Sequence, residues 1–371
     1  MNTVALLLLS AAMTGCVHAK DRRYVLVEVS RPAGVAPPYV ARDKESGKAL
    51  PCQWDDKTVR FLVPAIPAGA KPEFVIEAGE EKVPAMELKD DPGGWISVRG
   101  SGREITRYYH KGEAVQKHLK PFFHPMVGHG INIFRDWPVV GDGAKEPKDH
   151  VHHTGMWFAY GDVNGKDYWT KVPIEPRAIL KREAGAAYAR IVAENAWGTD
   201  LVETQDVTFL IAGEDVVVDV LITLAAPNGP AVFAKNPEKA KEGAFAVRVG
   251  ASLSEVARKG EDYGAKFMSD AKGNKGEQAI RPADAVWVDY SGDVGGKKVG
   301  IALMNHPSNF RHPSAWMVRS YGLFAANPWL AKGESTIEKG KPMVLRYRVY
   351  LHAGTAAEGK VADVYEGFSG E

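Results

Sequence analysis

Histidine, carboxylate and arginine side chains concentrate in two segments that lie far apart in this sequence. The first segment, residues 149–158, reads Asp-His-Val-His-His-Thr-Gly-Met-Trp-Phe, and the second, residues 305–313, reads Asn-His-Pro-Ser-Asn-Phe-Arg-His-Pro. Five of the eleven histidines of the chain fall in these two stretches. Because imidazole transfers protons near neutral pH and binds divalent metals, this clustering indicates chemistry rather than packing.

The first segment offers candidate proton-transfer groups in His152 and His153. Asp149 precedes them, and a carboxylate can orient an imidazole by accepting the proton of its second ring nitrogen. On an extended segment His150 and His152 would project to one face and His153 to the other, so only two of the three could serve one site directly. The alternative is a turn whose histidines hydrogen-bond to the backbone and to one another.

The second segment supplies groups that complement the first. Arg311 carries a fork of donors suited to a carboxylate or to vicinal hydroxyls, and His312 or His306 could act as an acid or a base. Further along the chain, the amide of Asn327 both donates and accepts. The alternative is a surface loop with an ordinary ion pair. Since loops can bring distant segments to one face of a fold, we expect both segments to form a single site.

The elements that must position these residues are strands. Short runs of β-branched and aromatic residues between proline, glycine and charged turns indicate a small β module over residues 20–90. Over residues 91–371 the strands are longer, and Val218-Asp219-Val220-Leu221-Ile222 alternates as a half-buried strand does. We therefore predict an all-β fold, a large antiparallel β-sandwich preceded by the small module, with the best helical candidate at residues 356–368.

Residues 1–19 predict export. An apolar stretch too short to span a bilayer leads into Thr14-Gly15-Cys16, which is similar to a bacterial lipobox. A rival cleavage site after Ala19 would give ordinary secretion. We expect a periplasmic or outer-membrane lipoprotein that touches the membrane only through a lipid on Cys16. Cys52 is then a lone thiol, which we interpret as a buried small hydrophobic residue.

Several motifs in the same order resemble one bacterial family, labelled "methane oxygenase PmoA" or PmoA-like. They are residues 149–165, Val286-Trp287-Val288-Asp289-Tyr290-Ser291-Gly292, residues 306–328, Lys120-Pro121-Phe122-Phe123-His124-Pro125 and residues 241–248. The resemblance extends over roughly residues 95–352 and implies a β-sandwich similar to the galactose-mutarotase-like sandwiches, in exported proteins of carbohydrate-using bacteria. Methane oxidation is set aside, because a membrane monooxygenase needs transmembrane helices and no apolar run of about eighteen residues follows the export segment.

The residues and the resemblance together indicate a carbohydrate-active enzyme, namely a hydrolase, a lyase or an epimerase, whose histidines and carboxylates exchange protons with a glycoside or sugar. Glycosidic chemistry usually needs an acid and a base beside the bond, so Glu242 and Asp162 are candidates, although both adjoin glycine and could be simple turn residues. The expected catalytic residues are His152, His153, His312, Asp149 and Glu242, and the expected substrate-binding residues are His124, Asp162, Arg311, Asn327 and Trp157.

The alternative function is a non-catalytic, sugar-binding lipoprotein that captures a small molecule or an oligosaccharide in the same cleft. Nucleic acid is not expected as a partner, because 47 basic and 46 acidic residues leave a net charge of only +1. A divalent metal could be held by His124, His150, His152 and His312, but their spacing matches no compact metal signature, and no cofactor is firmly implied.

Overall fold

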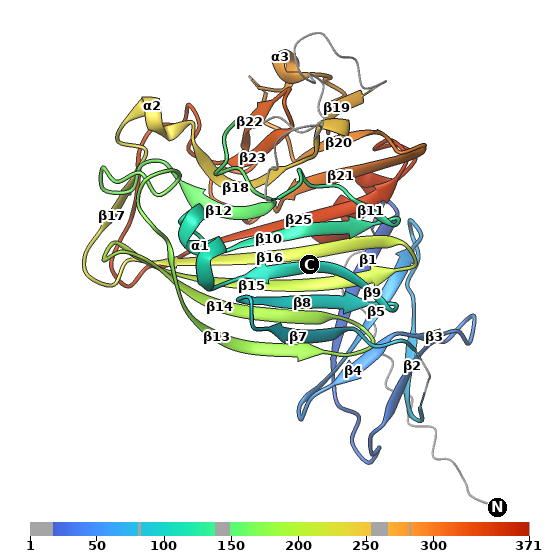
Figure 1. Cartoon of the computed structure of the whole chain (residues 1–371). Helices are drawn as coiled ribbons and strands as arrows, with labels where there is room; N and C mark the ends of the chain where they lie inside the picture. The colour runs from blue at the N-terminus through green and yellow to red at the C-terminus, as the bar shows by residue number, and fades with distance from the viewer. Residues whose placement is uncertain (1–17, 81–82, 138–148, 254–265, 282, 371) are drawn as a thin grey trace, which may run out of the picture.

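Two large antiparallel sheets make up most of the molecule, and a smaller N-terminal module packs against the outer face of one of them (Figure 1). The computed structural model describes residues 18–80, 83–137, 149–253, 266–281 and 283–370. The predicted export segment therefore lies outside the described residues, apart from its last two positions. Within the described ranges, no helix combines the length and the apolar character needed to cross a membrane.

The nine-stranded sheet carries the first histidine segment at the start of one of its strands. Its order is β22-β23-β18-β12-β10-β9-β8-β7, with β11 paired to β10. The strands are β7 (Glu87–Asp91), β8 (Trp95–Gly100), β9 (Arg103–Tyr109), β10 (Phe122–Gly128), β11 (Ile131–Asn132), β12 (Met156–Tyr160), β18 (Gly243–Arg248), β22 (Ala315–Arg319) and β23 (Leu323–Asn327).

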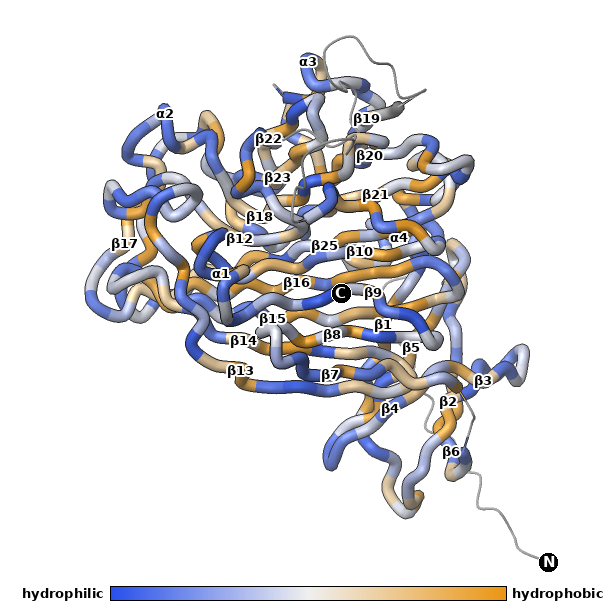
Figure 2. Tube along the Cα trace, in the orientation of Figure 1, coloured by the Kyte–Doolittle hydropathy of each residue, from blue (hydrophilic) through white to orange (hydrophobic). Residues whose placement is uncertain are grey.

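The eight-stranded sheet is the second layer, with the order β13-β14-β15-β16-β25-β21-β20-β19. Its strands are β13 (Glu175–Ala184), β14 (Ala189–Trp197), β15 (Leu201–Ala212), β16 (Asp215–Ala225), β19 (Lys266–Asp270), β20 (Trp287–Val294), β21 (Lys297–Asn305) and β25 (Met343–Ala353). Figure 2 shows hydrophobic residues along the strands of both sheets and hydrophilic residues around α2 (Pro237–Ala240) and α3 (Glu277–Ile280).

Aromatic rings join the inner faces of the two sheets. Phe158 contacts Trp197 with ring centroids 5.7 Å apart, and Phe245 stacks on Tyr347 at 4.9 Å. Because side chains alternate along a strand, Trp157 and Ala244 point to the opposite, outer face of the nine-stranded sheet. The predicted all-β class and large antiparallel β-sandwich are confirmed.

The N-terminal module has two small sheets and its own core. One sheet has the order β1-β5-β4 and the other β3-β2-β6. Their strands are β1 (Arg22–Ser30), β2 (Tyr39–Asp43), β3 (Ala49–Leu50), β4 (Cys52–Trp54), β5 (Thr58–Ile66) and β6 (Phe74–Ala78). Cys52 packs against this core partly buried, and burial raises the pKa of its thiol to about 11.

The module ends earlier than the expected boundary at residue 90. Strand β7, residues 87–91, already pairs with β8 in the nine-stranded sheet. It is a mostly exposed edge strand, so the apolar alternation that marks a strand is missing from its sequence.

The remaining elements are short. They are α1 (Gly112–His118), a 3-10 turn (Ala251–Leu253), α4 (Val361–Ser369) and the paired strands β17 (Ala231–Phe233) and β24 (Ser335–Ile337). Helix α4 buries Val361, Val364 and Phe368 in a cluster that also contains Tyr24 and Leu62 of the module. The last helix therefore helps to fix the module on the outer face of the eight-stranded sheet.

Candidate functional site

Strand β12 places the first histidine segment on the outer face of the nine-stranded sheet. Trp157 points to this face, and His153 stacks on it with ring centroids 5.7 Å apart. The neighbouring outward positions on β12 and β18 are Ala159 and Ala246, with Ala246 directly opposite Trp157. Their small side chains leave room for rings to lie over the sheet.

A buried arginine holds residues 149–153 in a turn. Arg135 donates to the carbonyl oxygens of Asp149, His150 and His153 at 2.6, 2.9 and 2.6 Å. His150 has a left-handed φ of 44°, and the His153 amide donates to the His150 carbonyl at 2.8 Å. Of the two alternatives, an extended segment and a turn, the structure has the turn, because the Arg135 guanidinium satisfies carbonyl groups that a strand would have paired with a neighbour.

The turn gathers all three imidazoles instead of dividing them between two faces. His150 stacks on His153 with centroids 4.9 Å apart, and the ring of His152 meets that of His153 edge-on at 4.3 Å. Tyr321 stacks on His150 with ring centroids 5.1 Å apart and on His153 at 6.4 Å. Tyr321, His150, His153 and Trp157 thus form one continuous stack of rings, which we call the ring stack.

Asp149 joins the ring stack to a second arginine. Its carboxylate accepts from Nδ1 of His150 at 2.6 Å, the orienting contact expected from the sequence, and from Arg248 at 3.0 Å. The Arg248 guanidinium lies 4.4 Å over the ring of Tyr321 and is fully buried. Burial alone would raise the pKa of Asp149, but Arg248 and His150 bring it below its ordinary value.

Two histidines of the site, His152 and His153, are held in the neutral form. Burial lowers the pKa of His152 to about 4, and the nearby Lys120 and His150 add to the effect. Burial also holds the pKa of His153 well below its ordinary value, with His152 and Arg248 as further causes. Nδ1 of His153 is buried and has no hydrogen-bond partner among the described residues. Both rings are therefore unprotonated at neutral pH, the form that a general base must have before it takes a proton.

Lys120 is the functional group that sequence reasoning missed. Its ammonium group is fully buried, 5.6 Å from the ring centroid of Trp157, and donates to the carbonyls of His118 and Trp169 at 3.2 and 3.4 Å. Burial lowers its pKa to about 7. The signal was a lysine two positions before the apolar strand residues Phe122 and Phe123, since a charged side chain beside a buried strand needs polar partners.

His124 supports the turn through Arg135. Its Nε2 donates to the carbonyl oxygen of Arg135 at 2.9 Å, and its ring stacks with Phe134. Burial lowers its pKa to about 4. The substrate-binding role expected for His124 is therefore replaced by a structural one, since its hydrogen bond fixes the residue that clamps the histidine turn.

Among the described residues, the second segment, residues 305–313, does not contact the ring stack through its arginine or its second histidine. Arg311 donates to the carbonyls of Pro328, Gly333 and Glu334, at 3.4, 2.8 and 3.1 Å. Nδ1 of His312 bonds to the amide oxygen of Asn305 at 2.8 Å, and burial lowers the pKa of His312. No contact in the described part of the chain joins Arg311 or His312 to the ring stack, so the expected single site is not formed.

Asn327 is likewise engaged in the fold. Its amide nitrogen donates to the carbonyl of Ala240 at 3.0 Å, and its oxygen accepts from the amide of Trp329 at 2.9 Å. It ends β23, whereas Tyr321 lies just before the other end of that strand. Asn327 is thus separated from the ring stack by the length of β23.

The two candidate carboxylates organise the loop after β12. Asp162 accepts backbone hydrogen bonds from Gly165 at 3.1 Å and Asn236 at 2.5 Å. Glu242 pairs with Lys239 at 3.0 Å, and Lys239 also reaches Asp167 at 3.1 Å. The turn alternative is therefore correct for Asp162, whose buried oxygens have their hydrogen bonds satisfied by backbone donors.

The described residues contain no group of three or more His, Cys, Asp or Glu side chains placed to hold a metal ion. The four histidines considered for a metal are divided between the ring stack, the Arg135 carbonyl and Asn305.

One protein family matches most of the chain. The family of unknown function DUF6807 matches residues 96–366, which span both large sheets. No curated protein sequence matches.

Solved structures with a similar arrangement are named for carbohydrate chemistry. An α-mannosidase from Enterococcus faecalis V583 is 11% identical over 94% of this chain and 44% of its own, with a TM-score of 0.35. A galactose mutarotase-like protein from Clostridium acetobutylicum is 8% identical over 74% of this chain and 100% of its own, with a TM-score of 0.30. A 4-α-glucanotransferase from Thermococcus litoralis is 9% identical over 72% of this chain and 39% of its own, with a TM-score of 0.24. The chain thus spans less than half of two of these proteins, and similarities this low support no conclusion about its activity.

Proposed function

Because the chain belongs to the DUF6807 family, whose function is unknown, we propose a function from its own residues: it is an enzyme that acts on a carbohydrate at the ring stack, with neutral histidines as proton acceptors. Tyr321, His150 and His152 present partly or fully exposed rings there, beside the carboxylate of Asp149. Sugars offer C–H faces to such rings and hydroxyl groups to carboxylates and imidazoles, and the ring stack provides groups of both kinds.

One observation carries the catalytic part of the proposal. His152 and His153 touch each other, are desolvated, and lie in the low-pKa environment of a buried lysine. A protein that only captures a sugar gains nothing from depressing imidazole pKa values, whereas a general base must be unprotonated before it can take a proton. In this proposal His152 is the base that meets the substrate, because its ring is more exposed than that of His153.

Asp149 and Arg248 act as positioning residues. Asp149 fixes the ring of His150 through Nδ1, and Arg248 fixes Asp149 and Tyr321 at once. Arg311, His312 and Glu242 have no part in this proposal, since their described contacts serve the fold elsewhere. We retain export with a lipid anchor on Cys16 and the PmoA-like resemblance as parts of the proposal that rest on sequence alone.

The test is a panel of glycosides and free sugars, offered to the purified chain with reducing-sugar and mass readouts. His152→Gln is expected to lower turnover of the best substrate at least a hundredfold, since general acid–base catalysis contributes about a hundredfold to ten-thousandfold. The control is His129→Gln, which removes a half-buried histidine that bonds to Asp215 beyond the far end of β10, away from the ring stack.

Equal activity in His152→Gln, His153→Gln and the control would exclude catalysis by these histidines. Saturable sugar binding without turnover, lost when Tyr321 is replaced by alanine, would instead establish the alternative of a sugar-binding protein.

A further inference from the structure

The outer face of the eight-stranded sheet carries a cavity that the proposed function does not use. Its volume is about 210 Å³, and it lies between that sheet, the N-terminal module and α4. Its lining includes Leu26 and Arg60 of the module, Arg190, Asp206 and Arg346 of the sheet, and Phe368 of α4. Pockets for drug-sized ligands measure roughly 300–1,000 Å³, so this cavity suits a smaller molecule such as one sugar ring.

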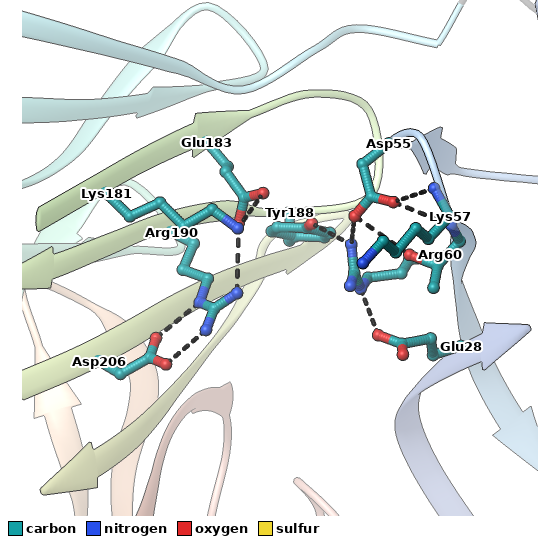
Figure 3. Close-up of polar contacts among 10 residues, drawn as sticks. Glu28, Asp55, Lys57, Arg60, Lys181, Glu183, Tyr188, Arg190 and Asp206 are labelled. Carbon is teal, nitrogen blue, oxygen red and sulfur yellow. Dashed lines mark hydrogen bonds and ion pairs between the residues drawn. The ribbon is translucent and has the colours of Figure 1, made fainter. Parts of the chain in front are cut away.

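Two of the arginines at the cavity are already neutralised (Figure 3). Arg190 donates to both oxygens of Asp206, at 2.7 and 2.6 Å. Arg60 donates to Glu28 at 2.6 Å and to Asp55 at 2.9 Å, and Tyr188 lies between the two clusters. These paired groups form fixed polar walls, since an incoming anion would have to displace a carboxylate.

Arg346 differs from both. Arg346 is exposed and lines the cavity. No carboxylate of the described residues lies within ion-pair distance of its guanidinium. The nearby Asp219 is taken by Arg348 at 2.6 and 2.8 Å. Asn309 fixes the backbone of Arg346 on both sides, at its amide and at its carbonyl. The Arg346 guanidinium, which has no ion-pair partner among the described residues, presents a fork of donors that fits a carboxylate.

We propose that this cavity binds an acidic monosaccharide, a hexuronate, whose carboxylate pairs with Arg346. The remaining lining suits the sugar ring: Phe368 and Tyr188 offer apolar ring surface, and the hydroxyl of Thr208 and the carboxylates of Asp206 and Asp219 offer partners for sugar hydroxyls. The site lies on the outer face of the sheet that does not carry the ring stack, so it goes beyond the proposed reaction and does not depend on it.

Titration calorimetry of the full chain tests the proposal with D-glucuronate, D-glucose and inorganic phosphate as probes. Glucuronate is expected to bind saturably and at least tenfold more tightly than either glucose or phosphate. Arg346→Gln is expected to weaken glucuronate about tenfold or more, since a hydrogen bond to a charged group contributes about 1.5–3 kcal/mol. His152→Gln is expected to leave this binding unchanged, which separates the two sites.

The matched control is Arg177→Gln. Arg177 lies on β13 of the same sheet, is exposed, and does not line the cavity. If glucuronate does not bind, if phosphate binds as tightly, or if Arg177→Gln weakens binding as much as Arg346→Gln does, the cavity is not a hexuronate site.

Discussion

Burial drives the pKa values of His152 and Glu203 in opposite directions and favours the neutral form of both. A desolvated imidazole loses its proton more readily, and a desolvated carboxylic acid retains its proton more strongly. Glu203 is fully buried between the sheets, where Trp197 Nε1 donates to one of its oxygens at 2.6 Å and the other oxygen has no partner among the described residues. Its pKa rises to about 7.

This shift predicts how stability depends on pH. Between an ordinary pKa of 4.5 and about 7, the unfolded chain releases the proton of Glu203 while the folded chain keeps it, so stability falls as pH rises. Glu203→Gln removes this pH-dependent loss of stability, because glutamine does not titrate. Relative to the wild type, the variant should gain about 3 kcal/mol in unfolding free energy between pH 4 and pH 8, because each pKa unit corresponds to about 1.4 kcal/mol. Urea unfolding at both pH values checks this, and parallel curves for the two proteins would contradict it.

At the scale of the element, the histidine turn depends on Arg135 more than on its own residues. Three carbonyl groups within residues 149–153 share one guanidinium, and His124 in turn fixes the Arg135 carbonyl. A lysine ammonium is a point charge and cannot meet three acceptors in the geometry of a planar fork.

Arg135→Lys is therefore expected to destabilise the protein by about 2–4 kcal/mol, since each buried carbonyl left without a donor costs about 1–3 kcal/mol and lysine retains part of the contact. Urea denaturation at pH 7 measures the loss, with the exposed Arg177→Lys as the control. The same substitution should also lower turnover, because the imidazoles lose their common support. A loss of stability below about 1 kcal/mol would show that the turn holds without its clamp.

The sequence predicted strands better than it predicted the site, and the reason is the range of the interactions. The alternation of β16 depends on residues two positions apart, so Val218-Asp219-Val220 was sufficient to place one face inside. The Asp149–His150 contact is equally local. In contrast, Arg135, Lys120, Arg248 and Tyr321 reach the histidine turn from other elements, and no spacing within residues 149–158 reveals them.

Arg311 failed as a predicted ligand group for the same reason. It adopts a left-handed φ of 56° and turns towards the carbonyl oxygens of residues 328–334, a pairing decided by the tertiary position of that loop. Its fork of donors was correctly identified, but its partners are the backbone.

For the whole molecule, the contact between α4 and β1 decides whether the module and the sandwich behave as one body. Gly367 faces the backbone of Arg23, and an added Cβ would lie 2.3 Å from the Arg23 carbonyl oxygen. Tyr24, the next residue, bonds to Asp215 of the sheet at 2.5 Å. The module is thus held by a close backbone approach and a buried polar contact.

Gly367→Ala is expected to destabilise this docking, although alanine in a helix interior normally gains about 0.5–1 kcal/mol over glycine. The backbone of Arg23 cannot move away as a flexible side chain could. Scanning calorimetry should show the single transition of the wild type dividing into two, with the module unfolding first. Ser369→Ala on the same helix is the control and should leave one transition, while a rise in melting temperature for Gly367→Ala would contradict the argument.

The same contact fixes an order of events when the chain folds. Lys20 and Glu366 form an ion pair at 2.6 Å although they are 346 positions apart in the sequence. The hydrogen bond from Tyr24 to Asp215 also joins residues that are distant in the sequence. Strands β1 and β5 are close in sequence and can pair early in folding, whereas docking of the module also needs the residues of α4. The apolar surface of Leu26 and Leu62 is therefore covered only after α4 has packed against it.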